Sequence, residues 1–259
     1  MSQGESGTSG TSVAVIILVV VGALALMGVC IVALGAVLIF PAVMFPAVNQ
    51  ARDAAQRTED ANNLKQIVLA LHNHQNAMRR FPSPNGWTED GQTPPRSWRV
   101  ELLPYLEQQA LYQQYDQEEA WNAPANRPLL DQIPKVYRSP RDEAAAMSAN
   151  AAYVLITGPG TVFPPDREPL SFGEIKDGSS NTVICMQLPG SDIPWLEPRD
   201  VDIDQVLALF ANPNGPIAKQ GGVNMGLADG SVRYISADID PQTLRALLTA
   251  DGGEVVGQF

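Results

Sequence analysis

The chain's two histidines, His72 and His74, are the first side chains to test for metal or acid–base chemistry, because imidazole serves both. They lie two positions apart in a segment with helical periodicity, which turns their side chains about 200° away from each other. One metal ion would need both on the same face, so we interpret them as polar residues on the solvated side of a helix. The sequence also contains no Gly-x-Ser-x-Gly elbow, no phosphate-binding glycine loop and no His-Glu-x-x-His motif.

Asp200, Asp202 and Asp204 have the spacing that opens a calcium-binding loop. The sixth position of that loop requires glycine and the twelfth a bidentate glutamate, but they are Gln205 and Ala211. We therefore predict that Asp204 caps the apolar helix 206–210 and that the chain holds no metal and no cofactor. With no nucleophile–base pair in the sequence either, we expect no enzymatic activity.

We interpret the tryptophans and one glycine-rich run as structural features of the fold. We interpret Trp87, Trp98, Trp121 and Trp195 as core or loop-packing residues, and an aromatic platform for sugars is the alternative. The run 158–161, Gly-Pro-Gly-Thr, is predicted to be a turn.

The net charge and the cysteine content limit the partners and the covalent or metal sites that the chain can have. The formal net charge is −11, which disfavours nucleic acid as a partner. Only Cys30 and Cys185 are present, one in an apolar block and one in the polar remainder, so we expect no disulfide and no cysteine metal site.

Residues 13–40 contain no charged side chain and predict a transmembrane helix, with the lipid bilayer as partner. A cleaved signal peptide is the alternative, but the leader 1–12 has no Lys or Arg and the apolar run is too long. Gly22, Gly28 and Gly35 would allow close helix–helix approach and self-association, or reflect the ordinary glycine content of such spans. Basic residues follow the span, which weakly favours a cytoplasmic domain.

After the span, Pro41 and Pro46 predict a kink, and residues 47–78 read as a helix that the prolines and glycine of 81–86 stop. This helix carries one apolar stripe at i, i+3, i+4 and i+7, formed by Leu64, Ile67, Val68 and Leu71. A second helix is predicted over 99–115, beginning near Pro104, and a loop over 121–140.

The C-terminal half carries strand signals. Strands are predicted at 153–156 and, after the Asp177-Gly178 turn, at 182–186. Asp229-Gly230 predicts a two-residue hairpin turn that pairs Leu227 with Val232, Met225 with Tyr234 and Val223 with Ser236. Asp240-Pro241 opens a short helix that Gly252-Gly253 closes. The predicted fold class is α+β.

The order of these segments resembles the planctomycete domain of unknown function numbered 1559, whose members look like type IV pilins or pseudopilins. The matching stretches run from Pro46 to the C-terminal part of the chain. They are 46–52, 63–67 with 70–73, Phe81-Pro82, 97–99 with 103–108, 157–161, 177–182, and 221–224 with the motif region 228–235 that contains Asp229, Gly230, Ser231, Val232 and Arg233.

The resemblance implies a pilin-like architecture, with a long N-terminal helix as a spine packed on an antiparallel sheet and the domain outside the cytoplasmic membrane. From the resemblance together with the segment patterns, we divide the chain into a short polar N-terminus 1–12, a transmembrane helix 13–40, a juxtamembrane spine helix 41–80 and a pilin-like globular domain 81–259. Three features depart from the family. Lys219 replaces a histidine ten residues before the Asp-Gly pair, Ser139-Pro140 replaces Cys-Pro, and the basic leader and helix glutamate of pilins are missing. We expect a structural or assembly component that stays anchored, and a tethered binding module for carbohydrate or protein is the alternative.

Overall fold

The computed structural model describes residues 9–84, 94–142, 148–165 and 167–253, and no side chains for 9–14 and 29–47 within its first helix. Trp87 and residues 1–8 of the predicted N-terminal segment therefore lie outside the described residues. The chain divides into two compact units, Met1–Ala54 and Ala55–Phe259. Helix α1, Ser9–Met78, contributes to both.

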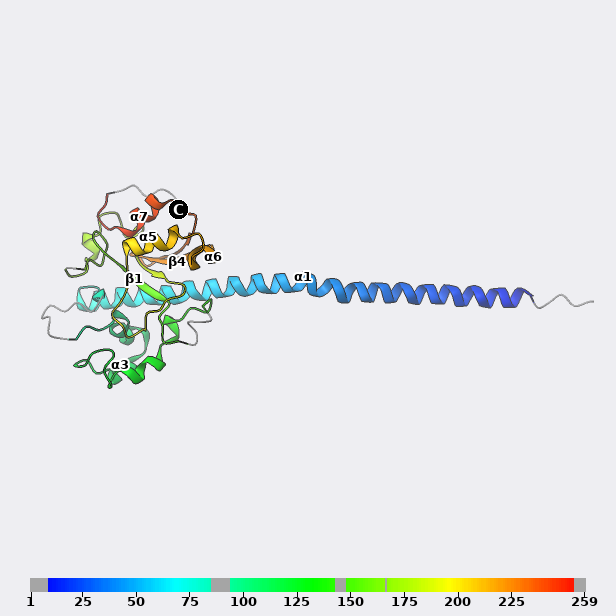
Figure 1. Cartoon of the computed structure of the whole chain (residues 1–259), viewed down its shortest axis with the longest axis horizontal. Coiled ribbons are helices and arrows are strands. Elements are labelled where there is room, and N and C mark those ends of the chain that lie inside the picture. The colour runs from blue at the N-terminus through cyan, green and yellow to red at the C-terminus, as the bar shows by residue number, and fades with distance from the viewer. Residues whose placement is uncertain (1–8, 85–93, 143–147, 166, 254–259) are drawn as a thin grey trace, which may run out of the picture. The chain divides into compact units, whose positions relative to one another are not determined.

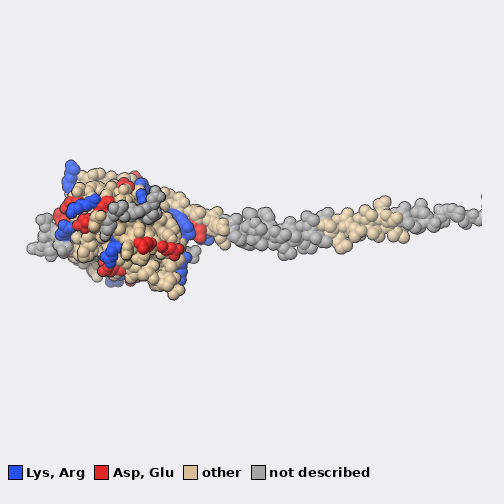
Figure 2. Space-filling model, turned by 90° about the horizontal axis from the view of Figure 1, so that it is seen from above, with Lys and Arg blue, Asp and Glu red and all other residues tan. Residues whose placement is uncertain are grey.

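Within the first unit, part of helix α1 presents an apolar surface. Its described side chains from Val15 to Met27 include ten large apolar ones that are at least half exposed, and Figure 2 shows no charged residue along this part of the helix. Helix α1 is assigned without a break through Pro41 and Pro46, so the prolines do not end it. Within the described residues, no helix is both long and apolar enough to cross a membrane. The transmembrane helix 13–40 stays a prediction.

In the second unit, the C-terminal part of α1 crosses one face of the sheet (Figure 1). Leu64, Ile67, Val68 and Leu71 are all fully buried there. The helix ends at Met78 because Arg79 adopts a left-handed conformation with φ 63°, and the chain then turns to bury Phe81. An apolar stripe that one helix cannot bury by itself is thus covered by the rest of the domain.

The sheet has five strands in the order β3-β1-β2-β4-β5. The strands are β1 Tyr153–Thr157, β2 Val183–Gln187, β3 Val201–Asp202, β4 Gly222–Leu227 and β5 Val232–Ser236. Strands β1, β2, β4 and β5 pair antiparallel as predicted, whereas the two-residue edge strand β3 pairs parallel to β1. The α+β class is confirmed.

Two apolar cores lie on the two faces of this sheet. On the α1 face, Tyr153, Leu155 and Cys185 pack with the buried stripe of α1. On the other face, Val154 and Ile156 pack with helices α5, Ile203–Ala211, and α7, Pro241–Leu248 (Figure 1). The alternation along β1 is the period of two that sends successive side chains to opposite faces.

The C-terminal hairpin has a different register from the predicted one. The observed pairs are Gly226 with Val232, Met225 with Arg233, Asn224 with Tyr234, and Val223 with Ile235, one residue away from the expectation. The reason is the turn: Gly230 N–H donates to Leu227 O, Leu227 N–H donates to Ser231 O, and Gly230 has φ 89°. This is a three-residue loop with a glycine bulge, a common alternative to the two-residue turn. The slip places Val232 and Tyr234 beside Gly226 and Asn224 on the face of α1, and it places Ile235 beside Val223 in the other core.

The segment predicted as one helix over 99–115 is broken into three pieces. These are α2 Trp98–Glu101, the 3-10 turn η2 Leu103–Leu106 and α3 Gln109–Gln114. Pro104 lies at the start of η2, and Glu107 ends it in a left-handed conformation with φ 60°. The remaining short helices are η3 Arg127–Gln132, η4 Lys135–Tyr137, η5 Phe172–Glu174 and α6 Pro216–Gln220.

Candidate functional site

The two histidines diverge as predicted but are not solvated. His72 Nε2 lies 3.0 Å from Ala228 O, and His74 lies 3.0 Å from Arg80 O through Nδ1 and 3.5 Å from a carboxylate oxygen of Glu101 through Nε2. His74 is buried and His72 is half-buried, and burial lowers the pKa of His72. The interpretation as surface residues was wrong, because the helix face beyond the apolar stripe is also covered by loops. Both imidazoles bind the domain's own carbonyl groups.

The three aspartates of the calcium-like spacing have three separate partners. Asp202, and not Asp204, caps α5: its carboxylate accepts from Gln205 N–H at 2.8 Å while Gln205 Oε1 accepts from Asp202 N–H at 2.9 Å. Asp204 lies in the first turn and pairs with Arg245 at 3.0 Å on the surface. The predicted cap was therefore displaced by two residues, because the helix begins at Ile203. In the described residues, no group of three or more His, Cys, Asp or Glu side chains could hold a metal ion.

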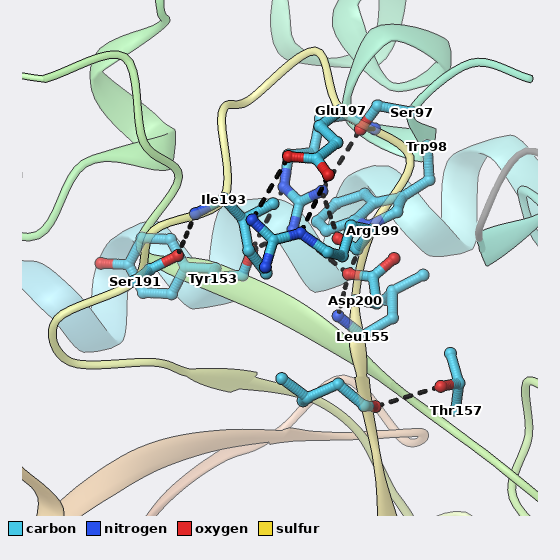
Figure 3. Close-up of polar contacts among 12 residues, drawn as sticks. Ser97, Trp98, Tyr153, Leu155, Thr157, Ser191, Ile193, Glu197, Arg199 and Asp200 are labelled. Carbon is cyan, nitrogen blue, oxygen red and sulfur yellow. Dashed lines mark hydrogen bonds and ion pairs between the residues drawn. The ribbon is translucent and has the colours of Figure 1, made fainter. Parts of the chain in front are cut away.

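Asp200 belongs to a buried polar junction that the sequence does not reveal (Figure 3). Its Oδ1 accepts from Trp98 Nε1 at 3.0 Å, from Leu155 N–H at 2.9 Å and from Arg99 Nη2 at 3.2 Å. Arg99 and Asp200 both have fully buried side chains. Arg99 also donates to Tyr153 O at 2.8 Å and lies over the Trp98 ring at 4.5 Å.

This junction joins α2 to the edge of the sheet. Burial raises the pKa of Asp200 against the opposing effect of Arg99, and burial lowers the pKa of Arg99. Asp200 Oδ2 is buried and has no hydrogen-bond partner among the described residues. A buried charge pair is costly unless it is well bonded, and here Asp200 Oδ1 accepts three hydrogen bonds and Arg99 also donates to Tyr153 O. We interpret the junction as a structural clamp.

A second buried carboxylate, besides that of Asp200, belongs to Asp60 on helix α1. Its two oxygens accept from Tyr153 Oη at 2.8 Å and from Gln187 Nε2 at 2.9 Å. Burial raises its pKa although these hydrogen bonds and that from Ser139 oppose the shift. Asp60 thus connects α1 with strands β1 and β2.

The hairpin loop of the family motif also contacts α1. Lys65 Nζ donates to Gly230 O, and the carbonyl of the neighbouring Ala228 faces His72. Asp229 accepts from Ser231 N–H at 2.8 Å and from Ser231 Oγ at 2.6 Å, which stabilises the turn. The motif loop therefore binds the helix through its backbone carbonyls.

Of the other motif residues, Val232 and Arg233 begin β5, and Lys219 lies at the far end of the hairpin. Val232 is partly buried against the core on the α1 face, and Arg233 is exposed beside Met225. Lys219 is an exposed residue of α6, just before β4, whereas the Asp-Gly loop follows β4. The structure does not bring Lys219 and Asp229 together.

The described tryptophans differ in how deeply they are buried. Trp98 and Trp195 are fully buried, and Trp195 Nε1 donates to Leu129 O and Leu130 O at 3.2 Å each. Trp121 is half-buried against the same core. Trp98 and Trp195 are core residues as predicted and cannot form a sugar platform. The 158–161 turn is also confirmed, with Thr161 Oγ1 donating to Gly158 O at 2.9 Å.

The described surface is hollowed on both sides of α5. A groove of about 460 Å³ separates α5 from α7 and is lined mainly by apolar residues, including Leu207, Phe210 and Leu244. A second hollow of about 480 Å³ lies between α5 and the loop 188–193 and includes Ser191, Asp192, Gln205 and Asn212. Both hollows have the concave shape that small-molecule binding sites take.

Taken together, the described residues define an α+β domain whose buried polar groups join its helices to the sheet. Residues 49–164 match the family described as "Protein of unknown function (DUF1559)", the family that the chain's motifs resemble. No curated protein and no solved structure matches the chain. The motif region around Asp229-Gly230 lies beyond the matched residues.

Proposed function

We propose that the protein is a single-pass component of the cytoplasmic membrane that displays a pilin-like structural domain on the extracytoplasmic side. It acts without catalysis, as a structural or assembly component of a cell-envelope or secretion-like apparatus. The observation that carries the proposal is the charge-free run 13–40, whose described side chains are helical and exposed from Val15 to Met27. Large apolar side chains in such a run are stable when lipid surrounds them.

Two further features support a structural role. The hydrogen bonds of Asp60 connect α1 with β1 and β2, and those of Asp200 connect α2 with the edge of the sheet. In addition, α1 carries the apolar run at one end and the stripe Leu64–Leu71 at the other, the arrangement that a pilin-like spine requires.

Membrane fractionation with alkaline carbonate extraction tests the anchor. The wild-type chain should stay in the pellet, and Leu24→Lys with Leu26→Lys should shift it toward the soluble fraction, because each lysine near the centre of a span costs roughly 3 kcal/mol. Leu69→Lys is the matched control, since Leu69 is an exposed leucine of α1 in the globular unit. Extraction of the wild-type chain by carbonate would refute the anchor.

Orientation and assembly need separate measurements. Protease added to intact spheroplasts should degrade the domain, and protection until the membrane is opened would place the domain in the cytoplasm. Crosslinking in native membranes should trap the protein with partners, and recovery of isolated monomers alone would refute the assembly role.

A tethered binding module for carbohydrate or protein is the second candidate. The hollow beside α5 favours it, because Ser191, Asp192, Gln205 and Asn212 line it with hydrogen-bonding groups. A glycan-array screen of the full-length chain in detergent tests the carbohydrate form, and Asn212→Ala should abolish any genuine hit. The absence of any hit would argue against it.

A further inference from the structure

Strand β5 lies at one edge of the five-stranded sheet, so only one of its two sides pairs with another described strand. The ladder with β4 is hydrogen-bonded at both ends of β5, through Ser231 O and Ala237 N–H. Bonded and non-bonded pairs alternate in an antiparallel ladder, so Arg233 and Ile235 between these ends also bond to β4. The backbone groups that point away from β4 belong to the even-numbered residues, which are Val232, Tyr234 and Ser236.

The outer side of β5 is open to solvent. Arg233, Tyr234 and Ser236 are exposed, and Tyr234 is a large aromatic side chain at 40% exposure. The strand contains no proline, and its five pairs with β4 follow one another without a bulge. An edge strand that lacks these features is a template for the addition of another strand.

An acidic hollow of about 380 Å³ lies beside this edge, between β5 and the start of α7. Strand β5 contributes Ile235 to its lining, and the charged residues that line it are Asp238 and Asp240, both exposed. Hydrogen bonds from Thr243 lower the pKa of Asp240, which keeps its carboxylate ionised. A basic side chain placed next to Ile235 would therefore meet two carboxylates.

A second copy of β5 supplies such a side chain when the two strands run antiparallel with Tyr234 opposite Tyr234. In this register all three outward residues of each strand are paired, because Val232 lies opposite Ser236 at both ends. A shift by two residues in either direction loses one of these pairs. In one direction the shift would also place Arg233 opposite Arg233, and like charges directly opposite each other are destabilising.

The same register places Arg233 of one copy opposite Ile235 of the other. Both side chains lie on the sheet face of α5 and α7, because Ile235 packs in that core and Arg233 is two residues away. Side chains directly opposite each other lie about 5 Å apart, so the long side chain of Arg233 reaches the hollow beside Ile235. The two-fold axis makes this contact twice, and on the other face it brings the two Tyr234 rings together.

We propose that β5 of one copy pairs antiparallel with β5 of a second copy, and that Arg233 of each copy binds the hollow lined by Asp238 and Asp240 of the other. The contact uses the same surface on both copies, so it closes at a dimer. The inference goes beyond a membrane-anchored structural role, because it assigns a self-association surface that does not use residues 13–40.

The pairing also sets the relative direction of the two copies. Helix α1 runs in the direction of β4, since Arg57 O accepts from Asn224 near the start of β4 and His72 contacts Ala228 O just beyond its end. The α1 segments 55–78 of the two copies therefore run in opposite directions. The test uses the full-length chain in mild detergent, in which two copies can approach each other from either side.

A charge exchange between two variants tests the proposal by sedimentation over a concentration series. The wild-type chain should form dimers. Arg233→Glu alone and Asp238→Arg alone should each dimerise at least about tenfold more weakly, because like charges then meet at both contacts. A one-to-one mixture of the two variants restores opposite charges at both contacts of the mixed dimer, and should dimerise close to the wild-type level.

The strand ladder has its own variant. Ser236→Pro removes an outward N–H and should abolish the dimer, since proline at this side of an edge strand leaves the bonds to β4 in place. Ser236→Ala keeps the N–H and should dimerise like wild type. Arg127→Glu and Asp131→Arg make the same charge changes at exposed positions of η3 and should also dimerise like wild type.

Three results would overturn the proposal. A wild-type chain that stays monomeric would leave the edge of β5 to a strand of a different protein. Dimers that neither charge variant weakens would place the contact elsewhere on the chain. A mixture that stays as weak as each variant alone would show that Arg233 and Asp238 do not meet across the dimer. Carbonate extraction reports separately on the anchor, so failure of one idea is distinguishable from failure of the other.

Discussion

The close approach between β4 and α1 predicts that Gly226→Ala destabilises the domain. A Cβ atom at Gly226 would lie 2.5 Å from Val68 Cγ2 and 2.7 Å from Cys185 Sγ, both buried, so the sheet or the helix must shift. Overpacking of this kind costs about 1–3 kcal/mol. Alanine recovers about 0.5–1 kcal/mol of backbone entropy relative to glycine. The expected net loss in the free energy of unfolding is therefore about 1 kcal/mol from the central values, within a range of about 0–2.5 kcal/mol.

Chemical denaturation followed by circular dichroism measures this loss, and the thermal midpoint should fall by about 2–4 °C for each kcal/mol. Gly173→Ala is the matched control, because a Cβ there meets nothing within 4 Å, and it should not lower stability. Val68→Ala removes the nearest methyl group, so Gly226→Ala should cost less in that background, with a coupling energy of about 0.5–3 kcal/mol. A Gly226→Ala variant as stable as wild type, or a cost unchanged by Val68→Ala, would refute the reasoning.

Three further predictions follow from the buried and capping carboxylates. Asp200→Asn leaves the buried Arg99 without its counter-charge and should cost about 3–5 kcal/mol in urea unfolding, whereas Asp192→Asn on the surface should cost under about 1 kcal/mol. Because burial raises the pKa of Asp60, the folded domain binds the proton of this carboxyl group more tightly than the unfolded chain does. The free energy of unfolding should therefore fall as the pH rises from about 4 through the folded pKa. Asp60→Asn should flatten this dependence when unfolding is measured from pH 4 to 7. Asp202→Ala should cost about 1 kcal/mol because it removes the cap of α5, and Asp204→Ala should cost under about 0.5 kcal/mol by the same thermal assay.

Each of these has a contrary result. Equal costs for Asp200→Asn and Asp192→Asn would mean that the Arg99 junction contributes no more than a surface pair. An unchanged pH profile in Asp60→Asn would assign the dependence to other groups. A larger loss of stability from Asp204→Ala than from Asp202→Ala would mean that Asp204 caps α5, as the sequence predicted.

Sequence patterns within one segment predicted the helices and strands whose formation depends on residues close together in the sequence. The stripe Leu64–Leu71 follows from helical periodicity alone, and the strand at Tyr153 from its run of β-prone residues. The hairpin was located correctly, but its register was wrong by one residue. Asp229-Gly230 is compatible with both a two-residue turn and a three-residue loop with a bulge, and the choice depends on contacts of the loop with α1.

The buried junction could not be predicted because its members are far apart in sequence. Arg99 and Asp200 are separated by 101 residues, and Trp98 and Asp200 by 102. Nothing in the segment 97–99 distinguishes a buried arginine from a surface one. The burial of Asp200, two residues before the cap Asp202, also depends on tertiary contacts, because the same series of aspartates would fit a surface loop.

The contacts of α1 have a consequence for the order in which the chain matures. Asn224 donates to Arg57 O, Lys65 to Gly230 O, and His72 contacts Ala228 O, across sequence separations of 167, 165 and 156 residues. The ribosome therefore completes the helix long before it makes the hairpin that covers it. Until then Leu64 and Leu71 have no β4–β5 hairpin over them, and transiently exposed apolar surface of this kind makes a chain prone to aggregation. The last strands of the sheet set the moment at which the first helix is buried.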